Sequence, residues 1–459
     1  MSRTAIIPNW CRLTLLAFVL AVVALLWARH HRGRAEYERR IAALQAAGEP
    51  VTASDFAARY PDPPPERDFG RLLRSLLPAG SDPAADPYPG DVSAVWEMVR
   101  TLSSREPFAP ELLEQARLEL ADNAASVELL LRTDLADFGL SYQWQNNGLA
   151  NYDGGRIILR IYLCRALALQ AAYEAEVGHP QRAATALLRG YQIAHLPGHS
   201  PLISAVGACS ACEGIMLPAV ERTLNRAKLT DDDLRCLGKA LHRPSDFLRE
   251  AVLIERTFQI YAWNDPTSWM FNGPASGDPK LHPMRSALYQ MRCRLRGYGG
   301  RLQLLDRWAD RVAATRLPMR EQLAAIATIE SKESQISASQ TNFASRVRKC
   351  WDVDYSLLPV TEVKRASMFI VNARQLAGLA SAQAAVAIER WRLAHPGRLP
   401  DGLSELVPAF LAAVPLDPYD GQPVRYKQLP VGYVVYSVGT GWTDQGERSG
   451  SAITLTVER

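Results

Sequence analysis

Cysteine is scarce in this sequence, and its distribution excludes a small fold that is cross-linked by disulfides. The chain has 459 residues but only 7 cysteines, at positions 11, 164, 209, 212, 236, 293 and 350. Their number is odd, and only Cys209 and Cys212 lie close together along the chain. A dense disulfide framework is therefore excluded, while cysteine usage leaves the redox compartment open.

A strong excess of charge of either sign is also missing. The chain carries 52 Lys and Arg against 48 Asp and Glu, a formal net charge of +4. This charge is small for the length, and no basic run is interleaved with aromatic residues, so nucleic acid is not expected as a partner. Hydrophobic residues make up 47% of the chain, which is ordinary for a folded protein of two or three domains.

Recognisable catalytic motifs are missing as well. The sequence contains no Gly-x-Ser-x-Gly, no phosphate-cradling glycine loop, no His-Glu-x-x-His and no dinucleotide fingerprint. We therefore expect a non-catalytic protein without a resident cofactor. The alternative is a hydrolase-type enzyme whose active site lies, without a known motif, in the helical part of the chain.

The motif Cys209-Ser-Ala-Cys212 is the part of the sequence that most resembles a redox site. It falls inside an expected helix from Leu202 to Asn225, and not at a helix N-terminus where the dipole lowers a thiol pKa. No histidine follows it, and no second pair of cysteines supplies further zinc ligands. We expect small, buried, inert cysteines on a packed helix, with a local disulfide or redox use as the alternative.

Two further groups of ionisable residues are weak candidates for chemistry. Asp352 and Asp354 lie two residues apart, but no neighbouring His or Glu completes a ligand set, so a polar loop is expected. The histidines of the body mostly stand at expected helix ends beside Pro or Gly, where they cap the helix or interact with its dipole. These are His179, His195, His199, His242, His282 and His395.

The longest apolar stretch runs from Leu13 to Ala28 and contains no charge and one hydroxyl group. A helix over this range rises about 24 Å, at the short end of what crosses a bilayer. Trp10 and Trp27 bracket it as an aromatic belt does, and arginines at both ends can reach the membrane surfaces. The stretch predicts an N-terminal transmembrane helix, in contact with lipid through Leu13, Phe18, Val22, Leu26 and Trp27.

The stretch has two alternative interpretations, a cleavable signal peptide and a buried core helix. The exit Leu26-Trp-Ala28 lacks the pair of small residues that a signal peptidase needs, and the basic run behind it disfavours a core helix. For the orientation of the helix in the membrane, the positive-inside rule favours a cytoplasmic body, because the arginines after the stretch outnumber those before it. The basic residues after the stretch are Arg29, Arg32, Arg34, Arg39 and Arg40.

Composition and the positions of proline and glycine divide the chain into four expected parts. Residues 1–34 form the membrane anchor, and residues 35–90 form a helical stalk with a proline-rich linker that includes Pro61-Asp-Pro-Pro-Pro65. Residues 91–360 form an all-α body of antiparallel helices, and residues 361–459 form a small α+β module. The fold class is therefore mainly α.

One stretch of the body resembles a tetratricopeptide helix hairpin. Tyr173, Gly178, Ala183, Gly190 and Pro197 fall near the positions where such a hairpin has its small residues and its terminating proline. No second copy follows at a fixed period. The resemblance implies one degenerate repeat, and an ordinary helix hairpin is the alternative.

The C-terminal module alternates between a helix and short strands. A long helix is expected over residues 362–395 and a short capped helix from Asp401 to Leu411. Residues 424–428 and 432–438 predict a β-hairpin whose turn contains Pro430 and Gly432. Residues 453–457 alternate cleanly between apolar and polar and predict a third strand with one buried face.

The residues of this module resemble the soluble part of the type II secretion major pseudopilin. The resemblance covers about residues 381–457 and rests on Gly397-Arg-Leu-Pro400, Gly402-Leu-x-x-Leu406, Pro415-x-Asp417-Pro418, Gly421-x-Pro423, Tyr426 and Tyr433-x-x-Tyr436-Ser437-x-Gly439. It implies a long helix that leads into a loop and a small antiparallel sheet, and a location outside the cytoplasm. The processing motif of pseudopilins is missing, so no pilus subunit is expected.

The pseudopilin resemblance also implies a calcium site in the loop after the Tyr-Ser-x-Gly strand. Only Asp444 and Glu447 remain there as carboxylates, and Thr440-Gly441 replaces the expected Asp-Gly. Calcium needs several oxygens held together. The two acids are therefore weak calcium candidates, with solvated turn residues as the alternative.

Together these features predict a single-pass, membrane-anchored envelope protein. The whole chain resembles a class of bacterial envelope proteins with this arrangement, and we expect its body outside the cytoplasm. Its expected role is the non-catalytic binding or scaffolding of another envelope protein, with membrane lipid as the second partner. A secretion-system accessory that contacts a pseudopilus is a further alternative.

Overall fold

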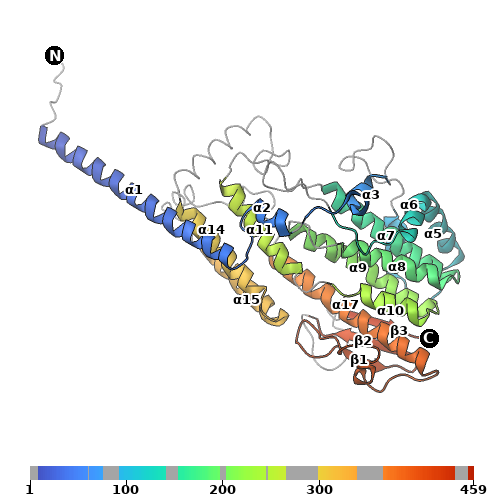
Figure 1. Ribbon diagram of the computed structural model, residues 1–459. Coiled ribbons are helices and arrows are strands. Elements are labelled where there is room, and N and C mark those ends of the chain that lie inside the picture. The colour runs from blue at the N-terminus through green and yellow to red at the C-terminus, as the bar shows by residue number, and fades with distance from the viewer. Residues whose placement is uncertain are drawn as a thin grey trace, which may run out of the picture. The chain divides into compact units, whose positions relative to one another are not determined.

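A computed structural model describes residues 9–59, 61–75, 92–140, 154–196, 203–243, 247–264, 298–338, 365–439 and 453–459. In these ranges the chain is mainly helical, with a small antiparallel sheet of three strands near the C-terminus (Figure 1). The predicted mainly α fold with a C-terminal sheet is confirmed. The chain splits into two compact units, one of Met1–Asp55, Arg256–Asp310 and Ser334–Glu362, the other of Phe56–Glu255, Arg311–Glu333 and Val363–Arg459.

The first unit is built around helix α1 (Asn9–Ala46), which continues without a break through residue 34. The C-terminal half of α1 packs on the start of helix α14 (Tyr298–Ala314), where the Tyr298 ring lies 5.6 Å from the Tyr37 ring. A Cβ at Gly33 would lie 3.0 Å from the Tyr298 Cβ, so glycine permits this close approach. The helix ends before Gly48, which has a φ of 70° and stands at the left-handed position after the last turn.

The N-terminal half of α1 presents apolar side chains that are largely exposed. Phe18 and Trp27, two of the expected lipid-facing residues, are 67% and 63% exposed. Leu13, Val22 and Leu26 also belong to α1, but their side chains lie outside the described part. Within the described ranges, none of the helices has a segment long and apolar enough to cross a membrane.

Short elements follow α1 along the chain. Helix α2 (Ala53–Arg59) begins with a capping box, in which the Asp55 amide donates to Thr52 Oγ1 and the Thr52 amide donates to Asp55 Oδ2. A short 3-10 turn, η1 (Pro65–Arg67), and helix α3 (Phe69–Ser75) come next.

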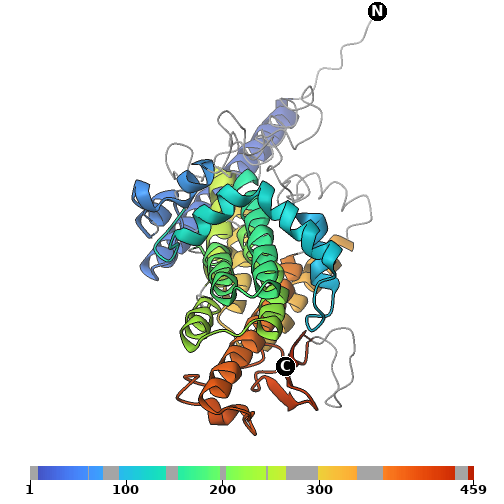
Figure 2. The ribbon, with the colours of Figure 1, turned by 90° about the vertical axis from the view of Figure 1, so that its right-hand side faces the viewer.

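The second unit contains the helical body, and its helices pack as neighbouring pairs. Helix α7 (Gly154–Glu176) packs on α8 (Pro180–Ala194) and α9 (Ile203–Arg226), which lie side by side (Figure 2). Helix α17 (Arg365–Ala394) lies between α9 and the C-terminal sheet, and α10 (Asp231–Ala240) contacts both α8 and α17. Helices α11 (Phe247–Asn264) and α15 (Met319–Ala338) complete the list of long helices in the described ranges.

The predicted tetratricopeptide-like hairpin corresponds to α7 and α8. Gly178 has a φ of 84° in the turn between them. A Cβ at Gly190 would lie 2.3 Å from the Met216 Cε of α9, so the small residue permits close packing of the helices. Pro197 lies outside the described residues.

One predicted helix of the body is divided in two. The sequence predicts a continuous helix from Glu111 to Leu131, whereas α5 (Pro110–Asp122) ends at Asn123 and α6 (Ala124–Arg132) begins after it. The Asn123 side chain donates to the Glu119 carbonyl at 2.9 Å. An Asn side chain that competes in this way for backbone groups disfavours a continuous helix. Helix α4 (Ser93–Thr101) precedes this pair.

The C-terminal module consists of α17, a 3-10 turn and three strands. Strands β1 (Arg425–Gln428), β2 (Tyr433–Ser437) and β3 (Ile453–Val457) form an antiparallel sheet, as predicted, and their order in it is β1-β2-β3. The buried Tyr433 hydroxyl donates to the Ala385 carbonyl of α17 at 3.1 Å and thereby ties the sheet to that helix.

The short helix predicted from Asp401 to Leu411 was wrong. The structure has a 3-10 turn, η4 (Leu403–Leu406), followed by irregular turns. Pro408 has no amide hydrogen and its ring clashes with the preceding turn, which disfavours a helix across this position.

Asp417 fixes the loop that precedes the sheet. Its side chain is fully buried and accepts hydrogen bonds from Ser437 Oγ at 2.9 Å, the Val438 amide at 2.7 Å and the Tyr419 amide at 3.0 Å. Arg425 lies 3.2 Å away as its counter-charge. One carboxylate therefore joins the loop to the ends of two strands.

We expect Asp417→Ala to loosen the module, because three donors and a guanidinium lose their buried partner. The local free energy of opening of strand β2 should fall by about 3 kcal/mol. Hydrogen exchange of β2 peptides, followed by mass spectrometry on the full chain, measures this change.

Asp420→Ala is the matched control, since Asp420 pairs with the same arginine but its side chain is 26% exposed. It should cost less than about 1 kcal/mol. Equal effects of the two substitutions would contradict the role assigned to Asp417.

Candidate functional site

A pocket of about 660 Å³ lies over the outer face of the C-terminal sheet. Its floor comes from alternate residues of the strands, because successive side chains of a strand point to opposite faces. Tyr433 and Val435 are buried on the inner face, whereas Val434 and Tyr436 line the pocket on the outer face. The alternating pattern that predicted the strands therefore also forms this floor.

Helix α9 forms one wall of the pocket and bonds to the edge strand β3. Glu221 Oε1 accepts from the Thr456 amide at 3.2 Å, and Asn225 Nδ2 donates to the Thr456 carbonyl at 2.8 Å. Asn225 Oδ1 also accepts from the Glu458 amide at 2.8 Å. Two side chains one turn apart thus satisfy backbone groups that an edge strand leaves without partners.

Arg222 of α9 holds the loop that forms the second wall. Its guanidinium donates to the carbonyls of Ser103 and Glu106 at 2.8 and 2.9 Å, and it pairs with Glu176 at 2.8 Å. The Phe108 ring lies 4.5 Å from its centre, close enough for a cation–π contact. Burial lowers the pKa of Arg222, and Glu176 opposes that shift.

The charged side chains at this pocket are mostly basic. Arg100 pairs with Glu97 along helix α4, and Arg105 pairs with Glu458. Lys427 is exposed and has no ion-pair partner among the described residues. None of the described residues that line the pocket is a histidine. The arrangement can bind an acidic or hydrogen-bond-accepting group, but it lacks a histidine that could serve as acid or base.

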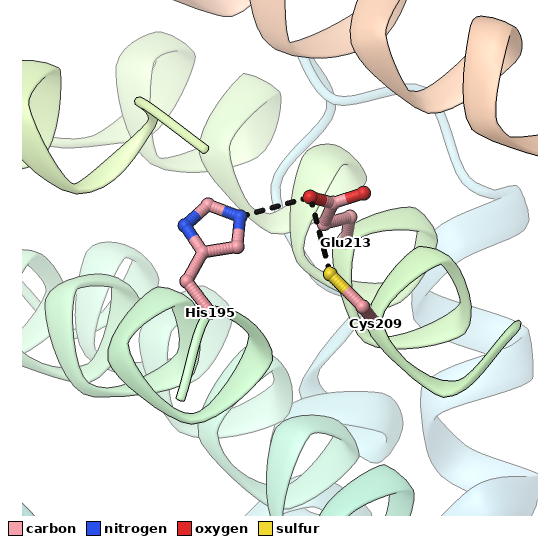
Figure 3. A group of neighbouring side chains, drawn as sticks. All are labelled: His195, Cys209 and Glu213. Atoms are coloured by element: carbon pink, nitrogen blue, oxygen red, sulfur yellow. Dashed lines mark hydrogen bonds and ion pairs between the residues drawn. The ribbon is translucent and has the colours of Figure 1, made fainter. Parts of the chain in front are cut away.

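A second group of side chains, which we call the buried cluster, consists of His195, Cys209 and Glu213 (Figure 3). His195 caps the C-terminus of α8, and the other two stand four residues apart on one face of α9. His195 Nε2 lies 2.8 Å from Glu213 Oε1, and the Cys209 thiol donates to the same oxygen at 3.6 Å. One imidazole, one thiol and one carboxylate therefore face a common point.

Arg243 supplies the positive charge beside this cluster. Its Nε lies 2.9 Å from Glu213 Oε1, and the two side chains are 3% and 0% exposed. Arg243 also donates from Nη1 to Asn372 Oδ1 of α17 at 2.6 Å. Glu213 Oε2 is buried and has no hydrogen-bond partner within the described part of the chain.

The cysteines singled out from the sequence are buried on α9 and free. Cys209 and Cys212 are less than 2% exposed, and neither is in a disulfide. Burial, with Glu213 as a further cause, raises the pKa of the Cys209 thiol. These findings confirm the predicted buried cysteines on a packed helix, and place Cys209 beside a histidine and a glutamate, which the sequence did not predict.

Most of the other candidate residues fall outside the part of the chain that the structure describes. The calcium candidates Asp444 and Glu447, as well as Asp352, Asp354, His199 and His282, lie outside the described residues. His179, His242 and His395 stand at helix ends, as predicted. His395 stacks on Trp391, with ring centres 4.1 Å apart.

The role of His195 was missed, because only its place at a helix end was visible in the sequence. The spacing of Cys209 and Glu213 was a usable signal, since residues four apart share a helix face. Nothing local indicated that the end of α8 would approach that face.

Comparison with known proteins gives no match. No family model matches the chain, and neither a curated protein nor a solved structure matches it. Function therefore has to be inferred from the geometry of the pocket and of the buried cluster.

We expect Arg243→Met to destabilise the second unit, because it leaves the Glu213 carboxylate buried without its counter-charge. Loss of one partner of a buried ion pair costs about 3–5 kcal/mol. The urea midpoint of the full chain, followed by circular dichroism, should fall accordingly.

The double variant Arg243→Met with Glu213→Gln should recover most of this loss, since the amide needs no counter-charge. If the double variant is as unstable as Arg243→Met alone, the cost comes from packing and not from charge.

Proposed function

We propose that this chain is a non-catalytic binding protein, held at a membrane by the apolar half of α1. In this proposal the pocket over the C-terminal sheet holds an acidic, extended segment of another envelope protein. The observation that carries the proposal is the pocket itself, which has a rigid wall, an open sheet as its floor and basic residues at its edge.

The size and chemistry of the pocket support this role. Ligand-binding clefts have volumes of about 300–1,000 Å³. Tyr436 and Val434 offer an apolar floor, and Lys427 offers positive charge to a segment with acidic side chains. The carboxylates at the pocket, Glu221 and Glu458, already engage the Thr456 amide and Arg105.

A hydrolase is the alternative function, and the geometry supports it less well. The His195 and Glu213 side chains are 9% and 0% exposed, so a substrate has no direct access to them. The pocket offers surface without a described histidine, which suits binding better than acid–base chemistry.

The exposed half of α1 supports attachment to a membrane. Seven large apolar side chains between residues 16 and 27 are 47–69% exposed. Water disfavours a contiguous apolar surface of this kind, and lipid would cover it. We propose that this part of α1 is a single-pass anchor, with α7 and α8 as one tetratricopeptide-like unit of the attached body.

The C-terminal module supports a location of the body outside the cytoplasm. We propose that its likeness to the soluble part of a pseudopilin, in the order helix, loop and three strands, reflects an envelope protein. The arginines that follow residue 28 favour a cytoplasmic body under the positive-inside rule. An accessibility test in intact cells decides between the two orientations.

The double variant Leu20→Arg with Val23→Arg tests the anchor. An arginine at the centre of a membrane helix costs about 2.5–3.5 kcal/mol, so the variant should leave the membrane fraction after alkaline carbonate extraction. The unchanged chain should stay in that fraction.

The control variant is Ala42→Arg with Gln45→Arg, which adds the same charge at exposed positions of the same helix. It should remain with the membrane. Extraction of the unchanged chain by carbonate would rule out an anchor.

Photo-crosslinking from position 427 tests the pocket. A photoreactive residue in place of Lys427 should capture a distinct partner in intact cells, identified by mass spectrometry. The same residue in place of Lys239, which is exposed on α10 and outside the pocket, should not capture it.

Capture of the same species from both positions, or from neither, would contradict a partner bound in the pocket. Hydrolysis of a substrate by the purified chain would favour the alternative.

A further inference from the structure

The buried cluster has the donor atoms of a transition-metal site. Imidazole nitrogen, thiolate sulfur and carboxylate oxygen are the ligands that Zn²⁺ takes in proteins. The donor atoms of His195, Cys209 and Glu213 all lie within 4.8 Å of one another. We propose that these three residues bind a divalent ion of the zinc class, independently of the pocket.

The distances between the donors fit a shared ion after a small rearrangement. Ligand atoms about 2.0–2.3 Å from a tetrahedral Zn²⁺ lie about 3.3–3.7 Å from one another. The distance of 3.6 Å between Cys209 Sγ and Glu213 Oε1 falls in that range. The distance of 2.8 Å between His195 Nε2 and Glu213 Oε1 has to open by about half an ångström, which a small rotation of either side chain provides.

Glu213 supplies an observation that is independent of this spacing. Its Oε2 atom is fully buried and has no hydrogen-bond partner in the described part of the chain. A buried acceptor without a partner is costly, and a cation is one group that satisfies it. An ion that Oε1 ligates at these distances can therefore take Oε2 as a second oxygen of the same carboxylate.

Binding of the metal with loss of the thiol proton changes the charge of the buried cluster by +1. Without an ion, Arg243 neutralises Glu213 and the Cys209 thiol keeps its proton. With M²⁺ bound, the Cys209 thiolate and the Glu213 carboxylate supply two negative charges, and the thiol proton leaves to water. Arg243 retains Asn372 Oδ1 at 2.6 Å and the Phe247 ring at 5.6 Å.

The depth of the cluster determines when an ion enters. His195 is 9% exposed and Glu213 is not exposed, so an ion is most easily bound as the chain folds. The metal ion should therefore be supplied to the cells while they produce and fold the chain. Cobalt is the suitable probe, because it replaces Zn²⁺ in such sites and its bond to a thiolate absorbs in the near ultraviolet.

The experiment uses full-length chain from cells grown with added Co²⁺ and purified in detergent. Native mass spectrometry should find one ion per chain, and the absorption spectrum should contain the thiolate-to-cobalt band. Cys209→Ser should lose the band. Cys212→Ser, the matched control on the same helix, should keep it, because Cys212 is not one of the three ligands.

A wild-type chain without a bound ion and without the band overturns the proposal, and so does a band that survives in Cys209→Ser or disappears in Cys212→Ser. If Cys209→Ser does not fold, His195→Gln serves as the second variant. It should keep the thiolate band when loaded but lose the ion on dialysis against a chelator far faster than wild type. Equal retention by His195→Gln and wild type overturns the proposal.

Discussion

The edge of a β-sheet has a row of N–H and C=O groups without partners, and each has to be satisfied if the sheet is to pack against other elements. In the C-terminal module one edge strand is β3, and it bonds to side chains instead of a further strand. Glu221 and Asn225 of α9 contact the backbone at Thr456 and Glu458. The position of the sheet therefore depends on α9.

The same helix carries further buried polar contacts of the second unit. Arg222 holds the loop of residues 102–109 through carbonyl oxygens and Glu176, and Glu213 pairs with Arg243. Buried charges are tolerated only when they are paired and hydrogen-bonded, so each contact restricts the helices that may pack on α9. One helix thus positions the wall of the pocket and holds two residues of the buried cluster.

The pocket and the buried cluster serve different kinds of recognition. The pocket is open, broad and basic, and it suits a polar segment that arrives from solution. The cluster is closed and compact, so it suits an ion that stays with the fold. Because the two sites share α9 but no residue, each proposal can fail without the other.

Local patterns in the sequence determined most of the elements. The three- and four-residue spacing of apolar side chains predicted the helices, and the alternation in residues 453–457 predicted β3. Gly48 and Gly178 adopt positive φ in turns, a conformation that depends mainly on what a single residue allows. The break at Asn123 and the irregular chain after Leu406 were missed, because one side-chain bond and one proline outweighed good helix propensity.

Only the tertiary structure decided which side chains meet. His195 stands 18 residues before Glu213, and Arg243 follows 30 residues after it, yet all three converge at one carboxylate. The pocket likewise combines α4, α9 and the last strands. A sequence pattern reports on neighbours within about one helical turn or one strand pair. Contacts between distant elements depend on how whole helices pack, and that is set by the shapes of many side chains together.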